Sequence, residues 1–315
     1  MPHAFFGEMY AERRPFWNTA IRGAVGTAQK YGETIRGSEL FKLHPASRGV
    51  TDFASLDNHI PLGLHGDGSS FSHQDSLFVL SFNSLVSGGS GQGFARRFLI
   101  TILRKTDITT GTWGQVWHAI SWSMNQLMVG ITPSENWKEI GIPGGDQWIA
   151  DGFRGLLVQV TGGWEFLANV LGLPPHNHAI NNCWMCAASN TIAHLLWNNC
   201  GPNAGWRRTK RSHAAWEQDY RIRSAAIPLL FRVFVGLTIS AVAIDTLHVV
   251  DLGVAAHVLR NIFLLVCFKR RGGSIESRVA ALGDEIEAWH RARRKQPGLR
   301  GKLTLQRLRS ESGFP

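Results

Sequence analysis

The hydrophobic period of the chain changes from two residues to about 3.6 partway along its first half, and this change constrains the fold most. Leu62 and Leu64 alternate with a glycine and a histidine, which is typical of a short strand, and this strand ends at Asp67 between two glycines. Two further apolar runs predict strands, and apolar residues then recur at helical spacing. The sequence therefore predicts an α/β fold that opens with strands at 60–65, 76–86 and 94–107 and a helix at 112–131.

The composition is that of a globular protein with a strongly basic end. The chain has 315 residues, of which 44% are hydrophobic and 18% charged, enough for one large domain or two small ones. Its net charge of +10 is uneven, since residues 269–309 hold twelve Lys or Arg against four Asp or Glu. Such a tail favours phosphate backbones or an anionic membrane surface, although a solvated basic helix has the same composition.

The apolar stretch from 225 to 244 raises the question of a membrane span. Pro228 and Arg232 interrupt it, and the uninterrupted run from Val233 to Ile244 has only twelve residues. About twenty apolar residues are needed to cross a bilayer, so a buried core segment is the better prediction. A membrane-associated protein anchored through residues 225–268 is the alternative. The N-terminal sequence lacks the basic-then-apolar order of a signal peptide, which predicts an intracellular protein.

An acid and a histidine follow the apolar run at a spacing of three. Asp245 and His248 fall on the predicted first turn of a helix, where a carboxylate suits the positive end of the helix dipole. The alternative interpretation is a helix cap followed by a histidine with satisfied hydrogen bonds. The helix is predicted from apolar residues three or four apart, which line one face: Leu247, Val250, Val254, Val258, Ile262 and Leu265.

The four cysteines predict a reduced protein with a metal-ligand pattern. Cys183 and Cys186 form a C-x-x-C, the spacing at which two thiolates grip one tetrahedral Zn²⁺. Two more ligands would be needed, and His194 and Cys200 are our first choice. Two buried thiols in a loop-rich segment are the alternative, and a redox pair is less favoured because the motif does not open a helix after a strand. Other ligands within reach along the chain are His176, His178 and His213.

Four basic residues follow this motif between two tryptophans. A segment of this kind can contact phosphates and stack on bases. Equally, it can be a solvated turn beside two core tryptophans. The predicted nucleic-acid-binding residues are Arg207, Arg208, Lys210 and Arg211, flanked by Trp206 and Trp216.

Taken in order, these motifs resemble a known family. The pattern consists of His65-Gly-Asp-Gly68, Gly163-Trp-Glu-Phe166, the C-x-x-C, and Asp245-x-x-His248. It is similar to the cut-and-paste transposases with a ribonuclease-H-like core, especially the CACTA and Plavaka-like groups, over roughly residues 60–268. The resemblance implies a ribonuclease-H-like mixed sheet with helices, a Cys/His-rich insertion and a basic helical C-terminal segment. The implied segments are 1–58 (role unknown), 59–175 (first part of the core), 176–224 (insertion), 225–268 (apolar segment and Asp-x-x-His helix) and 269–315 (basic tail).

The resemblance also implies a chemistry, which is DNA strand cleavage and transfer by two divalent ions, Mg²⁺ or Mn²⁺, held by acids. Asp67 matches the first acid, and Asp245 and His248 match an element that orients the site. The second acid should leave the strand predicted around residues 155–160. Gly162 and Gly163 stand there instead, so either Glu165 substitutes or the site is broken.

The third acid expected from the family is also missing from its usual place. The acids available downstream look like surface positions of the basic tail, which predicts a core that is truncated before its last element. DNA is the implied partner, an oligomer is compatible with the family, and a functional protein would be nuclear. The alternative is a non-catalytic nucleic-acid-binding remnant that uses a zinc-knuckle-like insertion and the tail. The downstream acids are Glu276, Asp284, Glu285, Glu287 and Glu311.

Overall fold

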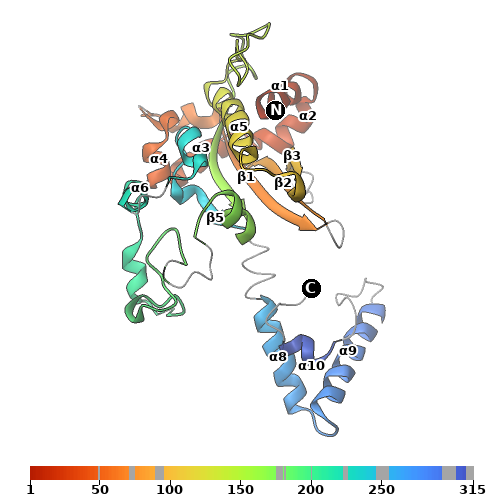
Figure 1. The fold of residues 1–315 in the computed structure, drawn as a ribbon. Coiled ribbons are helices and arrows are strands. Elements are labelled where there is room, and N and C mark those ends of the chain that lie inside the picture. The colour runs from red at the N-terminus through yellow and green to blue at the C-terminus, as the bar shows by residue number, and fades with distance from the viewer. Residues whose placement is uncertain are drawn as a thin grey trace. The chain divides into compact units, whose positions relative to one another are not determined.

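The computed structural model divides the chain into two compact units, Met1–Ala243 and Ile244–Pro315, each described by itself (Figure 1). The first unit is built on a mixed five-stranded sheet with helices, and the second is helical apart from the end of one strand. The fold is therefore mixed α/β, as predicted. The structure describes residues 1–48, 50–70, 75–88, 96–174, 180, 182–199, 201–222, 226–245, 255–292 and 303–309.

The sheet has the strand order β3-β2-β1-β4-β5. The first three strands form an antiparallel meander, and β4 returns parallel to β1 after a helical crossover. All three predicted opening strands are present, and the strand predicted around residues 155–160 is β4. The strands are β1 (His59–Ser70), β2 (Ser76–Ser84), β3 (Phe98–Arg104), β4 (Arg154–Gly162) and β5 (Val242–Ile244).

Strand β1 is longer than its sequence pattern predicts. It does not end at Gly66 but continues through Asp67 and Gly68 to Ser70, paired with β2 along this whole length. Both glycines are part of the strand, and each lies against a bulky side chain that a Cβ would meet. A Cβ on Gly66 would lie 2.1 Å from the ring of Phe166, so only glycine leaves room for that buried ring. The glycines therefore mark close packing and not the end of the strand.

Helices cover the two faces of the sheet. On one face lies α5 (Thr112–Val129), whose Trp113 and Leu127 pack against β2 and β4, together with α1 (Pro2–Glu12). The helix predicted at 112–131 is thus confirmed, and it ends at Gly130, which adopts the left-handed conformation that suits a helix C-terminus. On the other face, α3 (Thr27–Ile35) contacts β1.

The N-terminal segment is more helical than its weak pattern suggests. Helix α4 (Glu39–Leu43) is capped by Ser38, whose hydroxyl accepts a hydrogen bond from the Phe41 amide at 3.2 Å. Phe6 and Trp17 pack edge to face at 4.5 Å between ring centroids and are fully buried. The remaining elements before β1 are α2 (Arg14–Trp17), η1 (Asn18–Arg22), η2 (Pro45–Ser47) and η3 (Phe53–Asn58).

The Cys/His-rich segment is mostly irregular, as its lack of periodicity predicts. Buried Trp216 anchors its end and contacts Phe231, with ring centroids 4.8 Å apart. The elements from β3 to this point that are not yet named are η5 (Lys105–Asp107), η6 (Phe166–Val170), η7 (Ala193–Leu195), η8 (Gly205–Thr209) and α6 (His213–Ile222).

The apolar stretch after this segment folds into short elements of the first unit. Leu230 and Ile239 are buried, in agreement with the predicted core segment. No helix among the described residues is both long and apolar enough to span a membrane. The stretch contains α7 (Leu229–Val233) and η9 (Ile239–Ala241) and then enters β5.

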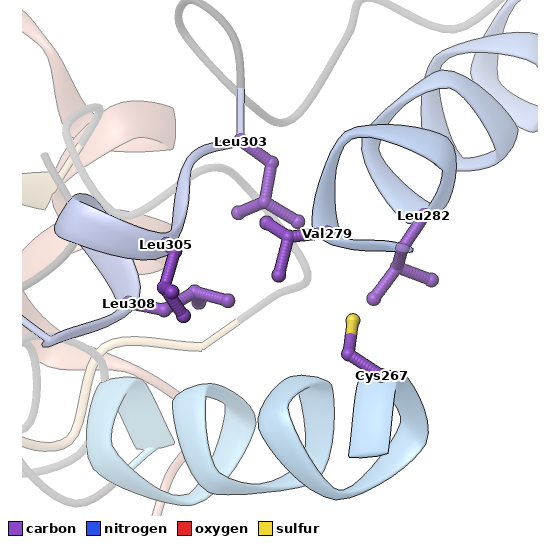
Figure 2. Close-up of a cluster of buried hydrophobic side chains, with 6 residues drawn as sticks. All are labelled: Cys267, Val279, Leu282, Leu303, Leu305 and Leu308. Carbon is purple, nitrogen blue, oxygen red and sulfur yellow. The ribbon is translucent and has the colours of Figure 1, made fainter. Parts of the chain in front are cut away.

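The second unit has a small hydrophobic core of its own (Figure 2). Leu303, Leu305 and Leu308 from the end of the basic tail are buried in it, although the sequence suggested no final core element there. In α8, Cys267 faces this core, while Val258 and Ile262 on the face that the spacing marks are 48% and 46% exposed. The helices are α8 (Ala255–Lys269), α9 (Ile275–Ala292) and α10 (Leu305–Arg309).

Candidate functional site at the strand ends and the Cys/His segment

The first candidate site lies where the parallel strands β1 and β4 end, at the same end of the sheet. Gly66 of β1 is the register partner of Gly162 of β4, and both adjoin the buried ring of Phe166. A Cβ on Gly162 would lie 2.2 Å from the carbonyl oxygen of Gly66, closer than any real contact. The two glycines therefore allow the strands and the following turn to approach one another, and this approach positions Asp67 and Glu165.

Asp67 is half-buried in the central strand, one residue after Gly66. Its Oδ1 accepts a hydrogen bond from the Gly68 amide at 2.9 Å, and the residue takes part in a further interaction. Its register partner on β2 is Val79, which in turn pairs with Ile102 of β3. Ile102 is 49% exposed, so this face of the sheet is open to solvent near its edge strand.

Glu165 lies next to β1 as well, on the turn that follows β4. Its carboxylate oxygen Oε2 is 2.6 Å from the point that a Cβ of Gly68 would occupy. The other oxygen accepts from the ammonium of Lys105, which follows β3, so that the ends of three strands meet here. Lys105 also lies 4.6 Å from the ring centroid of Phe78. No role was predicted for Lys105 from the sequence.

Asp67 and Glu165 lie on opposite faces of β1. Successive side chains of a strand point to alternate faces, and β1 is regularly paired with β2 from Leu62 to Ser70. The Gly68 position faces Glu165 and Lys105, so Asp67 points to the other face. The register of β1 and β4 ends at the pair of Gly66 and Gly162, and Gly163 is the first residue after β4. The residue that follows this last pair on the β4 side is therefore a glycine, which has no carboxylate.

The second predicted pair of the site is only partly described. Asp245 directly follows β5, at the start of the second unit, and it takes part in an interaction. His248 lies outside the described residues. That Asp67 and Asp245 face one pocket remains a prediction. The downstream acids Glu276, Asp284 and Glu285 are exposed on α9, and Glu285 forms an ion pair with Arg270 at 2.7 Å; Glu311 is not among the described residues.

The C-x-x-C forms a close thiol pair. Cys186 is buried and Cys183 half-buried, and the Met185 amide donates to the Cys183 sulfur at 3.3 Å. A hydrogen bond between the two thiols, with help from this amide and the nearby Arg211, lowers the pKa of Cys183 to about 6 against the opposing effect of burial. The same hydrogen bond raises the pKa of Cys186. The pair therefore holds one thiolate at neutral pH.

Of the two further zinc ligands that we chose first, the structure describes His194 alone. His194 is exposed in η7, and Cys200, His176 and His178 lie outside the described residues. Across the ranges that the structure describes, no three His, Cys, Asp or Glu side chains are grouped so that they could hold a metal ion.

The predicted nucleic-acid-binding residues lie directly beside the C-x-x-C. The Ala187 amide donates to Oγ1 of Thr209 at 2.9 Å, and the Arg211 amide donates to the carbonyl of Met185 at 2.8 Å. These hydrogen bonds hold η8 against the cysteine turn. The sequence alone did not reveal this contact, because neither segment has a regular period.

The four basic side chains differ in what they contact. Arg207 lies 4.8 Å from the ring centroid of Trp206 and donates to the Gly201 carbonyl at 3.2 Å. Arg211 is paired with Asp219 at 3.1 Å and is 20% exposed, and its assignment as a phosphate contact remains a prediction. Trp216 is fully buried, so it is a core tryptophan and not a stacking platform. Arg208 and Lys210 are exposed.

Neither a protein-family model nor a curated protein sequence matches the chain.

Proposed function

We propose that the chain derives from a transposase with a ribonuclease-H-like core and that it binds nucleic acid without cutting it. The proposal combines the resemblance of the motifs with two features of the fold, the strand order and the side on which each acid lies. Metal-dependent strand cleavage and transfer are then the ancestral activity. A cleaving enzyme is the competing function, and one experiment separates the two.

The sheet supports the ancestry. Three consecutive antiparallel strands, a helix on one face, and a fourth strand returning parallel to the first are the layout that the family resemblance implies. Asp67 lies on the central strand of this sheet, as the first acid of such a core should. The following Trp-Glu-Phe turn after β4 also lies against β1, where the second acid would be expected.

The proposed loss of cleavage rests on which side chains lie near Asp67. Two-metal cleavage requires acids that converge on shared ions. Here the first residue after the last β1–β4 pair is Gly163, which has no carboxylate, and the carboxylate of Glu165 lies on the side of β1 that Gly68 faces, in an ion pair with Lys105. Carboxylate oxygens suit Mg²⁺ or Mn²⁺, but two acids on opposite faces of a strand do not fit one shared ion. The described residues therefore do not fit the metal site of the family.

The nucleic-acid surface is the cluster at η8. Arg208 and Lys210 are exposed and lie beside Arg207 and the ring of Trp206, an arrangement of cations next to an aromatic side chain that suits a phosphate backbone with a nearby base. The net charge of +10 favours the same class of partner through long-range attraction.

Cleavage is tested by incubating supercoiled plasmid with the protein and Mn²⁺. The proposal predicts that the wild type nicks no faster than Asp67→Asn, because the site lacks its second acid. Asp107→Asn, a change at an exposed acid that follows β3, controls for the preparation. Mn²⁺-dependent nicking that is abolished only in Asp67→Asn would establish the competing function and end the proposal of a non-cleaving protein.

Binding is tested by measuring the affinity for a duplex DNA as a function of salt. Each cation that neutralises a phosphate contributes about 0.9 to the slope of log K against log salt. Arg208→Ala combined with Lys210→Ala should therefore reduce this slope by the amount expected for two cations. Lys30→Ala, which removes an exposed cation from α3, should leave the slope unchanged. Equal slopes for the wild type and the η8 variant would contradict the assignment of this surface.

A further inference from the structure

Strand β3 is the edge of the sheet among the described strands, and its outer side carries no partner strand. Leu99 and Ile102 of β3 are 60% and 49% exposed. An edge of this kind presents a row of backbone donors and acceptors that can accept another strand. The question is what chemistry the added strand should have.

An apolar groove begins where β3 begins. It has a volume of about 540 Å³. Phe98 at the start of β3 forms one side, and α1 and α2 form the other. Phe16, which is 41% exposed, packs against Phe98 with ring centroids 6.1 Å apart. A strand added to β3 would bring an alternate side chain to this groove. The described lining residues are Phe5, Met9, Arg13, Phe16, Arg97 and Phe98.

The charged side chains that line the groove are all positive. Arg13 and Arg97 line it and are exposed, and no ion pair to either is present within the described part of the chain. At the other end of β3, Arg104 is paired with Asp75 and Lys105 with Glu165. A ligand that adds to β3 should therefore carry negative charge at the groove end, and none is required at the far end.

This distribution argues against a second copy of the chain. Antiparallel pairing of β3 with itself would bring Arg97 against the end that holds Arg104 and Lys105, whose charges are already balanced by their own partners. It would leave both groove arginines uncompensated. The apolar groove likewise argues against a DNA backbone, which has no side chain to fill it.

We propose that the outer edge of β3 and the adjoining groove bind an extended acidic peptide by strand addition. The peptide backbone pairs with β3, one large apolar side chain enters the groove beside Phe16 and Phe98, and a neighbouring carboxylate contacts Arg13 and Arg97. The site is independent of the η8 surface and of the chemistry at Asp67.

The probe is a fluorescent nonapeptide, Asp-Leu-Thr-Val-Thr-Val-Thr-Leu-Asp, which presents an Asp-Leu pair to the groove in either direction of pairing. We expect saturable binding to the full chain with slower hydrogen exchange of the amides in 98–104. The same peptide with alternate backbone amides methylated keeps its charge and side chains but cannot add to a strand, and it should not bind.

Variants locate the site. Arg97→Glu should weaken binding about tenfold, since it replaces an attraction by a repulsion. Lys30→Glu makes the same change of charge in α3, on the other face of the sheet, and should leave the affinity unchanged. Phe16→Ala should weaken binding by removing one wall of the groove.

The proposal would be overturned by no binding of the nonapeptide, by equal binding of the methylated peptide, or by equal binding of the peptide to Arg97→Glu and to the wild type. Displacement of the peptide by a duplex DNA whose own binding is abolished in Arg97→Glu would assign this surface to phosphate, and would also overturn it.

Discussion

The two candidate sites of the first unit differ in what holds their residues in place. At the strand ends, the positions of Asp67 and Glu165 follow from the register of β1 and β4 and from glycines that leave room for one buried ring. In the Cys/His segment, Cys183 and Arg211 are held by local hydrogen bonds between irregular stretches. Regular pairing therefore decides which face a side chain occupies, whereas local hydrogen bonds decide how a thiol ionises.

Because the two sites are held in place differently, substitutions should impair them in different ways. At the strand ends, a glycine at position 163 leaves the sheet intact but supplies no carboxylate for a metal ion shared with Asp67. In the Cys/His segment, the environment of Cys183 depends on several groups, and each of them adjusts its pKa. Substitutions at the strand ends should therefore change the packing and the stability of the sheet. Substitutions in the Cys/His segment should change the pKa of Cys183.

The largest expected effect comes from Gly162→Ala at the strand ends. Its Cβ would meet the backbone oxygen of Gly66, which cannot rotate away, so the strands must separate. We expect a loss of about 3 kcal/mol in the free energy of unfolding, measured by urea denaturation. Gly114→Ala in α5, whose Cβ would have open space, should instead gain about 0.5 kcal/mol. Similar values for both variants would refute the account of close strand packing.

The next effect tests the Cys/His segment through pH. The Cys183 thiolate should be present above a pH of about 6 and lost as the pH falls through that value. Its alkylation rate, followed by mass spectrometry of the modified peptide, should therefore reach half its maximum near pH 6. Cys186→Ala removes the largest cause of the low pKa and should slow alkylation at about pH 6.5 by about fivefold. A rate that does not change in Cys186→Ala, or that rises only above about pH 8, would contradict the paired-thiol description. Cys267→Ala, in the second unit, is the control.

The smallest effect is expected at Lys105. The ion pair with Glu165 is partly exposed, with 25% and 47% of the two side chains accessible, so Lys105→Met should cost only about 0.5 kcal/mol of folding free energy. Thermal denaturation at low and high salt measures it, and the difference between the two proteins should shrink at high salt. A cost that is large and independent of salt would mean that Lys105 acts through packing on Phe78 instead.

Much of the sheet could be predicted, because strands with one buried face have a period of two residues. The three opening strands and α5 were found in this way. The continuation of β1 past Gly66 could not be predicted, because a glycine in a strand pattern more often marks the end of the strand than close packing. The ring of Phe166, for which Gly66 makes room, is about a hundred residues further along the sequence.

The candidate site was predictable as a set of residues but not as an arrangement. Asp67 and Glu165 are both near the strand ends, yet their faces depend on the registers between strands, which hydrophobic periodicity does not specify. The same limit applies to α8, whose apolar period gives the helix correctly while Ile262 lies on its exposed side. The contact of Arg211 with Met185 rests on single backbone hydrogen bonds, which leave no pattern in the sequence.

The central claim is that none of the described acids shares a metal ion with Asp67, because glycine occupies position 163, directly after the last register pair of β1 and β4. Gly163 precedes the turn after β4 and its carbonyl accepts from the Leu167 amide, a helix-capping position at which aspartate is well tolerated. Mn²⁺ binding, followed by electron paramagnetic resonance, tests the claim in the wild type, Gly163→Asp and the uncharged control Gly163→Asn. The account predicts specific Mn²⁺ binding in Gly163→Asp alone, abolished by a second change, Asp67→Asn. Tight Mn²⁺ binding by the wild type that disappears in Asp67→Asn would contradict it.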